Sequence, residues 1–154
     1  MQNSTHTTTQ INEIIFTPIT NNRFIVYFED DNLSIPSFLI NGFTPIHVLN
    51  CYPIKEVQYS PIVFNINTSD KINVEQHLFK YFDNTKFTPN LKIKKIKIDY
   101  LDATGYVIMT YNIIESQIRS LSTSHSSWQD TRPRELYLEV IPSDIQVIYP
   151  SDNK

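Results

Sequence analysis

The sequence predicts a mainly β, α+β fold: an antiparallel β-sandwich or barrel with one packed α-helix. The first observation is composition, because Ile, Val, Thr, Tyr and Phe dominate the apolar positions and aromatic residues reach 12% of the 154 residues. These side chains fit the pleated surface of a sheet better than a helix. The second observation is order, because a single segment of helical period lies between several stretches with the character of strands.

The chain from Arg23 to Asn67 is predicted to be largely extended. In Arg23–Phe28, successive side chains alternate between two partly apolar faces, as expected for a strand that is covered on both sides. Extended character continues through Ser34–Ile46, where prolines mark a sheet edge or the strand ends. Ile54–Asn67 forms the next extended stretch, and Pro61 interrupts it.

One segment, within Asn65–Asn84, changes to a helical period. Its apolar residues fall at positions i, i+4, i+7 and i+8, and they are Val74, Leu78, Tyr81 and Phe82. We expect Ser69 to cap the N-terminal end of the helix, and Asn84 and Pro89 to end it. The predicted helix has about three to four turns, the usual length in globular proteins.

A β-hairpin is predicted after the helix. Its strands are Leu91–Tyr100 and Tyr106–Ile113, joined by the turn Leu101–Gly105. The carboxylate of an aspartate can bond to the turn backbone, and a glycine adopts a positive φ at almost no cost. The candidate turn residues are Asp102, Thr104 and Gly105.

The remaining segments are also predicted to be mostly strands. Ile114–Leu121 is expected to form another strand, and Ser122–Arg134 is a polar loop around Trp128. Glu135–Ile141 alternates cleanly between apolar and polar residues, and Ile145–Tyr149 is a last short strand. Strands, one helix and strands again fit a sandwich or barrel with the helix packed on it.

The length predicts a single domain, from residue 21 to residue 150. Residues 1–20 are expected to form a flexible or partly ordered arm, because Met1–Thr9 is polar without apolar periodicity, and residues 151–154 a short tail. No apolar run is long enough to span a membrane and the start lacks signal-peptide character, so we expect a soluble, unsecreted chain. A net charge of -3 gives no chain-wide attraction to nucleic acid or anionic lipid.

Residue types that carry chemistry are present, but not in catalytic or metal-binding patterns. The four histidines lie far apart, and the lone Cys51 is expected to be a small buried apolar residue. Glu29–Asp31 is expected to be a solvated turn, and Ser122–Ser127 lacks the glycine-flanked turn that presents a nucleophile. Two glycines, Gly42 and Gly105, cannot form a phosphate-cradling loop. We therefore predict no catalytic, cofactor-binding or metal-binding residue, no cofactor, and a protein that is not an enzyme.

The one basic concentration is a run of four lysines, Lys92, Lys94, Lys95 and Lys97. Lysines at strand spacing could contact phosphate, but we favour a solvated strand face whose charges prevent wrong edge pairing. Ile93 shares side-chain parity with one pair of these lysines, and Ile96 with the other pair. The inward face must therefore switch within the run, which predicts a β-bulge.

Between Asn22 and Tyr149 the predicted elements follow a distinctive order. They are the aromatic-rich strand Arg23–Phe28, the segment Phe38–Phe43, the apolar strand Ile62–Ile66 with the helix directly after it, the hairpin Ile96–Ile113 with its Leu-Asp-Ala-Thr-Gly-Tyr-Val turn, the Ser/Trp/Asp stretch Ser126–Asp130, and the closing strand Asp144–Tyr149. This order resembles the tail-tube proteins of contractile-tailed bacteriophages and related injection machines. The whole order, rather than any single element, carries the resemblance.

The resemblance implies a structural virion protein that forms hexameric rings, stacked into the hollow tail tube for genome ejection. Long hairpins from each subunit would join an intersubunit β-barrel. The implied partners are copies of the same chain, the tail sheath protein, a baseplate protein or tube initiator, a tail terminator, and a tape-measure protein and DNA in the lumen. The implied location is the tail of the virion, after assembly in the host cytoplasm.

Carried over to this chain, the lumen-lining hairpins correspond to Ser34–Ile66 and Lys92–Ile113. The candidate intersubunit or lumen residues are Ile96, Ile98, Tyr100, Tyr106, Ile108, Thr110, Ile40, Phe43, Val57 and Tyr59. One departure concerns charge, because lumens in this family are often negative so that DNA slides, and inward-facing lysines would oppose this. The lysine run is therefore expected at a ring interface or on the outer surface.

Three alternative functions stay open. The first is a tube-end, baseplate hub or initiator protein of the same fold, although such initiators usually carry extra domains. The second is a non-enzymatic, β-rich binding module with a tyrosine-rich surface formed by Tyr100, Tyr106 and Tyr111. The third and least favoured is a small hydrolase, for which no nucleophile, base and orienting group can be nominated.

Overall fold

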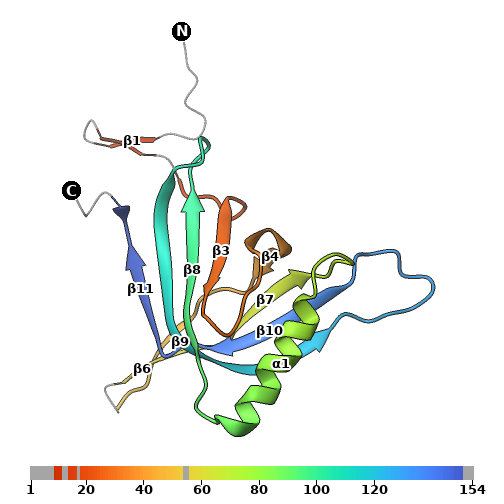
Figure 1. Ribbon diagram of the computed structural model, residues 1–154. Helices are drawn as coiled ribbons and strands as arrows, with labels where there is room; N and C mark the ends of the chain where they lie inside the picture. Colours follow the sequence, from red (N-terminus) through yellow and green to blue (C-terminus); the bar gives the residue numbers. More distant parts are fainter. Residues whose placement is uncertain (1–8, 12–13, 17, 54–55, 151–154) are drawn as a thin grey trace.

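The protein is described by a computed structural model that covers residues 9–11, 14–16, 18–53 and 56–150 (Figure 1). Its strands are β1 (Thr9–Ile11), β2 (Ile14–Phe16), β3 (Phe24–Glu29), β4 (Ile40–Phe43), β5 (Val48–Asn50), β6 (Val57–Tyr59), β7 (Ile62–Asn67), β8 (Ile93–Leu101), β9 (Val107–Thr123), β10 (Glu135–Ile141) and β11 (Asp144–Ile148). Its helices are the 3-10 turn η1 (Ser37–Leu39) and the α-helix α1 (Val74–Phe87). Within these ranges the chain is mainly β with one α-helix, which confirms the predicted fold class.

The main sheet has seven antiparallel strands, ordered β3-β8-β9-β10-β7-β4, with β11 also paired to β9. The 17 residues of β9 pair with β8 and β11 in their first part and with β10 in their second part. β9 therefore divides the sheet into a β8 half (β3, β8, the first part of β9, and β11) and a β10 half (the rest of β9, β10, β7 and β4). Figure 1 shows the strands of the β10 half crossing those of the β8 half.

β9 changes direction at Glu115, where φ is 46°, a left-handed value that is uncommon for a residue with a side chain. The hydroxyl of Ser143 donates a hydrogen bond of 2.6 Å to the carbonyl oxygen of Glu115, and the amide of Ser143 bonds to the carbonyl of Ile114. The connection between β10 and β11 thus holds the bend. The sequence prediction of a separate strand at Ile114–Leu121 is corrected, because one continuous strand runs through that region.

The two halves of the sheet pack face to face through every second side chain. The buried residues that meet are Val26, Phe28, Ile96, Ile98 and Ile113 in the β8 half and Ile62, Phe64, Ile66, Leu136, Leu138 and Val140 in the β10 half. The rings of Phe28 and Phe64 meet edge to face with centroids 5.3 Å apart. Buried and half-buried residues alternate along β10, so the strand predicted over Glu135–Ile141 is confirmed with the same bounds.

α1 contributes the buried residues Val74, Leu78 and Tyr81 to the core, while Phe82 is only half-buried. The helix has 14 residues and begins after Asn73, not after Ser69. Ser69 instead accepts a hydrogen bond from the amide of Lys71 in the preceding turn, at 3.1 Å. The helix also continues past Asn84 to Phe87, and the amide of Thr88 still bonds to the carbonyl of Asn84.

Two further predictions about the first half of the chain need correction. Ser34–Ile46 is not extended throughout, because η1 forms directly after Pro36 and precedes β4. The predicted strand at Ile54–Asn67 is two strands, β6 and β7, separated at Pro61 as expected. β5 was not predicted, and it pairs with β6 to form a short two-stranded ribbon. Residues 54 and 55, between these strands, lie outside the described residues.

The predicted β-bulge in the lysine run is not found. From Ile93 to Tyr100 the register between β8 and β9 is constant, and it shifts only between Tyr100 and Leu101, near the hairpin turn. The inward face nevertheless changes, because Ile93 and Ile96 are both buried. Lys94 and the left-handed Glu115 are the two residues left without a partner in this part of the ladder, between the pairs Ile93–Ser116 and Lys95–Ile114. The inward face therefore switches at these unpaired residues, without an inserted residue.

Part of the predicted N-terminal arm has secondary structure, because β1 and β2 pair with each other in an antiparallel ladder. Residues 1–8 of the arm and the predicted tail, residues 151–154, lie outside the described residues. No helix in the described part of the chain is long and apolar enough to cross a membrane.

Candidate functional site

Residues that could carry chemistry do not converge in the structure. In residues 9–11, 14–16, 18–53 and 56–150, no three His, Cys, Asp or Glu side chains gather into a possible metal site. Asp30, from the acidic triplet, accepts hydrogen bonds from the amides of Asn32 at 2.7 Å and Lys94 at 2.6 Å, so it closes a turn. Cys51 is half-buried near the end of the β5–β6 ribbon, so the prediction that it is buried is wrong.

The turn between β8 and β9 is built around one carboxylate. Asp102 Oδ1 accepts hydrogen bonds from the Thr104 amide at 2.9 Å, the Thr104 hydroxyl at 2.7 Å and the Tyr106 amide at 3.0 Å. The Thr104 hydroxyl contributes most to holding the pKa of Asp102 below its ordinary value. Gly105 has a φ of 95°, which a residue with a side chain adopts only with strain. All three candidate turn residues therefore lie in the tight turn between β8 and β9.

The face of the β8 half that points away from the core carries paired charges. Lys95 lies opposite Glu29, with Nζ 3.4 Å from the carboxylate. Lys97 Nζ lies 3.7 Å from the carboxylate of Asp99 and 4.8 Å from the ring centre of Tyr27. Each of these lysines thus has a carboxylate beside it, and a phosphate would have to compete for it. We call this surface the paired-charge face.

The hydroxyl of Thr110 donates a 2.7 Å hydrogen bond to Asp99, also on the paired-charge face. The other two lysines of the run, Lys92 and Lys94, lie elsewhere. Both are exposed, and Lys92, just before the start of β8, has its Nζ 3.4 Å from the hydroxyl of Ser143. The lysine run is therefore divided between two locations and does not form a single basic patch.

Four of the candidate intersubunit residues are buried within the chain. Ile40, Ile96 and Ile98 lie in its core, and Thr110 is buried on the paired-charge face. Alternation along a strand shows which side chains share a face, but not which face the rest of the chain covers. Of the remaining candidates, Phe43, Tyr59, Tyr100 and Ile108 are half-buried, and Val57 and Tyr106 are exposed.

The tyrosines proposed for a binding module do not form one surface. The rings of Tyr100 and Tyr111 pack edge to face, with centroids 6.1 Å apart, and both are half-buried. Tyr106 is exposed at the hairpin turn instead. Burial raises the pKa of Tyr100, as expected for a phenol in an apolar site. A tyrosine-rich contact surface is therefore not formed by these three residues.

The β8 half ends in two strands that have a partner on one side only. Among the described strands, β3 pairs with β8 alone, and β11 pairs with β9 alone. Such edges carry backbone donors and acceptors that a strand of another chain can satisfy. The two edges lie at opposite ends of the same four strands, on either side of the paired-charge face.

A second exposed region is the β5–β6 ribbon, of which the sequence pointed only to Val57 and Tyr59 in β6. Its apolar residues Val48, Leu49 and Val57 are exposed. The hydroxyl of Tyr59 donates a 3.2 Å hydrogen bond to Asp144, which ties the ribbon to the start of β11. Between the ribbon and the β10–β11 connection lies a groove of about 300 Å³. We call it the ribbon groove.

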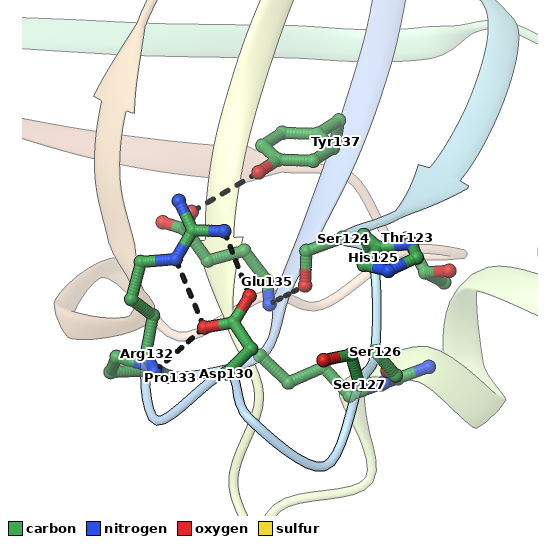
Figure 2. A pocket seen from close by; sticks show the side chains of 11 residues that line it. Thr123, Ser124, His125, Ser126, Ser127, Asp130, Arg132, Pro133, Glu135 and Tyr137 are labelled. Atoms are coloured by element: carbon green, nitrogen blue, oxygen red, sulfur yellow. Dashed lines mark hydrogen bonds and ion pairs between the residues drawn. The ribbon is translucent and has the colours of Figure 1, made fainter.

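The third region is the loop at residues 124–134, which projects from the β10 half (Figure 1). A polar cleft of about 380 Å³ lies between this loop and the start of β10. Figure 2 shows the side chains that line it. Asp130 binds Arg132 through both carboxylate oxygens, at 3.0 and 2.8 Å, and the Ser124 hydroxyl accepts a hydrogen bond from the Glu135 amide. Neither Ser124 nor Asp130 is bonded to His125 in this cleft, so the loop does not hold a hydrolytic triad.

The Asp130–Arg132 pair is expected to hold this loop in a pH-dependent way. Hydrogen bonds from the Arg132 side chain, and then from its amide, lower the pKa of Asp130 to about 2. A carboxyl with a lowered pKa stabilises the folded loop above its ordinary pKa of about 3.9, and this contribution is lost as the pH falls toward about 2. The fluorescence anisotropy of Trp128, the single tryptophan, should therefore decrease over that range.

Replacing Asp130 by asparagine should give the same low anisotropy at pH 7, because the neutral amide cannot form the paired contact with Arg132. Asp31→Asn is the matched control, since Asp31 is exposed in a different turn. An anisotropy of the Asp130→Asn variant equal to that of the control would show that the ion pair does not order the loop.

Comparison with known proteins gives matches of fold only. No protein-family model and no curated protein matches the sequence. A chain from the sheath/tube terminator of PVC, an extracellular contractile injection system, matches with a TM-score of 0.67 and 16% identity over 86% of this chain and 98% of that chain. A chain from the PVC sheath–tube complex matches with a TM-score of 0.60, 16% identity, and coverage of 86% and 92%. Hcp1 from E. coli EAEC 042 matches with a TM-score of 0.54, 10% identity, and coverage of 86% and 93%.

Proposed function

Because this chain has the fold of the tail-tube proteins of contractile injection systems, we propose that it is a structural, non-enzymatic subunit of such a tube. Copies of the chain form hexameric rings, and the rings stack into a hollow tube. The observation that carries this proposal is the pair of one-sided edge strands, β3 and β11, at the two ends of the β8 half.

A ring satisfies both edges at once. If β3 of one copy pairs with β11 of the next, each contact joins two different surfaces, and contacts of this kind close into a ring when the rotation allows. The β8 halves then form a continuous intersubunit β-barrel without free edges. The lone chain would expose both edges, which is a hazard for aggregation, so self-assembly also protects the chain.

In such a barrel, the paired-charge face is the surface that lines the lumen, because the opposite face of the β8 half is covered by the β10 half. Lys95 and Lys97 then face inward, contrary to the expectation from the sequence. Glu29 and Asp99 offset their charges, so lysines in the lumen would not hold a passing polyanion such as DNA. These ion pairs support an inward position for the two lysines.

The complete proposal places the tube in the tail of a bacteriophage virion, assembled in the host cytoplasm. A tape-measure protein and DNA pass through its lumen, and the genome is delivered through it. The partners are a sheath protein around the tube, a baseplate protein or initiator at one end, and a terminator at the other. The PVC structures that match in fold, a sheath–tube complex and a sheath/tube terminator, support partners of this kind.

A tube-end protein is the second candidate function, and one observation favours it. The TM-score with the chain of the PVC sheath/tube terminator, 0.67, is higher than the 0.60 with the chain of the sheath–tube complex. A terminator would form a single ring or cap on a tube, whereas a repeating subunit would form long stacks.

The test is the assembly state of the purified chain. We expect hexamer-sized particles by light scattering, and stacked rings or tubes by negative-stain electron microscopy. Val147→Lys places a charge on β11, at an exposed position of the edge, and should leave monomers. The matched control is Phe87→Lys at the end of α1, away from both edges, which should assemble like the unchanged chain.

The outcomes separate the candidates. Isolated rings without stacking would favour the tube-end function. A protein that stays monomeric at high concentration and does not join purified tail components would contradict both functions. Rings that are equally stable with Val147→Lys would contradict the pairing of β3 with β11.

A further inference from the structure

Trp128 is completely exposed to solvent, and it is the only tryptophan in the chain. It lies in the projecting loop at residues 124–134, among polar residues. An aromatic side chain buries about 150–250 Å² when it packs, and tryptophan is enriched among the residues that dominate binding energy at interfaces. A fully exposed tryptophan is therefore a candidate contact for a partner.

The turn that presents Trp128 is ordered by hydrogen bonds on both sides. The amide of Asp130 bonds to the carbonyl of Ser127 at 3.1 Å, and the amide of Gln129 bonds to the Ser127 hydroxyl at 3.2 Å. The Asp130–Arg132 pair closes the next part of the loop. The backbone of the turn is thus ordered before any partner arrives, which lowers the conformational entropy lost on binding.

The ribbon groove is a suitable receptor for such a side chain. Val57, which is 58% exposed, lies on one wall, and Ile141 lies on the other. The hydrogen bond from Tyr59 to Asp144 fixes the two walls relative to each other. The groove volume of about 300 Å³ is sufficient for an indole ring.

Trp128 and the ribbon groove lie at opposite ends of β10. β10 begins beside the Trp128 loop and ends at Ile141 in the ribbon groove, and its seven residues span about 23 Å at the usual rise of a strand. Figure 1 shows the loop and β6 on opposite sides of the molecule. Two different complementary surfaces at opposite ends of one chain are the arrangement that joins copies head to tail.

The charges of the two surfaces do not oppose docking. Both arginines of the loop are already paired, Arg132 with Asp130 and Arg134 with Glu75 of α1. Among the described residues that line the ribbon groove, Glu56 is the charged one. A contact between the loop and the groove therefore brings no like charges together.

We propose that Trp128 of one copy docks into the ribbon groove of a second copy. This contact rests on the self-assembly proposed above, but it is separate from the pairing of strand edges. It uses the side chains of the projecting loop and the ribbon groove, whereas the edge pairing uses the backbone of β3 and β11, so one contact can fail while the other holds.

The single tryptophan provides a direct measurement. On assembly of the full chain, Trp128 emission should shift to shorter wavelength, and acrylamide quenching should fall several-fold, because the indole moves from water into the ribbon groove. Particles that assemble while Trp128 keeps the emission and quenching of the dispersed chain would overturn this proposal and leave the edge-paired ring intact.

Two variants test the two sides of the contact. Trp128→Ser removes the docking indole, and Val57→Asp places a charge in the ribbon groove. Each variant alone should raise the protein concentration needed for assembly by about tenfold or more. An equal mixture should recover part of that loss, because the groove of the Trp128→Ser chain can accept the tryptophan of the Val57→Asp chain.

Phe87→Ser, at an exposed aromatic residue outside both surfaces, is the matched control and should assemble normally. Circular dichroism of each variant checks that the chain is folded. An unchanged assembly threshold in folded Trp128→Ser would contradict the docking contact alone. The absence of any association between unchanged copies would contradict both the contact and the proposed tube.

Discussion

Replacing Ile98 by aspartate is expected to destabilise the chain by roughly 4 kcal/mol or more and to leave it largely unfolded. Ile98 is fully buried in the centre of β8, between the two halves of the sheet. A carboxylate there loses its hydration, and the surrounding core side chains are aliphatic and aromatic. The loss should be measured as the midpoint and free energy of chemical denaturation, followed by circular dichroism.

Val48→Asp is the matched control, because Val48 is exposed on the β5–β6 ribbon. Its free energy of unfolding should stay within about 0.5 kcal/mol of the unchanged chain, as for most surface substitutions. If Ile98→Asp folded as stably as Val48→Asp, the inward face of β8 would be assigned incorrectly. The paired-charge face would then be the buried one.

Phe64→Ala is expected to lower the free energy of unfolding by about 3–5 kcal/mol, the usual cost of removing a buried phenylalanine. Phe64 is fully buried on β7, and its ring packs against Phe28 at 5.3 Å and Phe43 at 6.0 Å between centroids. The substitution removes apolar contacts and leaves a cavity where the two halves of the sheet meet. Denaturation by urea, with an unchanged dependence on denaturant concentration, would isolate this loss of stability.

Phe87→Ala provides the comparison, since Phe87 is 86% exposed at the end of α1. The same chemical change there should alter the free energy of unfolding by less than about 0.5 kcal/mol. A Phe64→Ala variant with an equally small change would mean that the two halves of the sheet do not pack through this ring.

The sequence was most informative where burial follows a simple period. β10 matches its predicted bounds because every second residue is buried, and Val74, Leu78 and Tyr81 define the inward side of α1. The start of α1 was misplaced because Ser69 can bond to a turn as well as to a helix end, and only the chain beyond it decides which. β5 was missed because its three residues are all exposed and have no pattern of burial.

The candidate site was less predictable for a different reason. Ile96 and Lys95 are neighbours on opposite faces of β8, and parity alone does not say which face another part of the chain will cover. The ribbon groove joins residues near positions 57 and 141, so no local pattern encodes it. The lone tryptophan in a polar loop was a usable signal, but its complete exposure depends on the turn that holds it.

The bent strand β9 affects how the molecule unfolds. Its two parts belong to different halves of the sheet, so each half loses a paired strand if β9 detaches. Proteins often unfold in separate cooperative units, each with its own opening free energy. A strand common to both halves prevents that separation here. The β8 and β10 halves should therefore gain and lose their order together, as one cooperative unit.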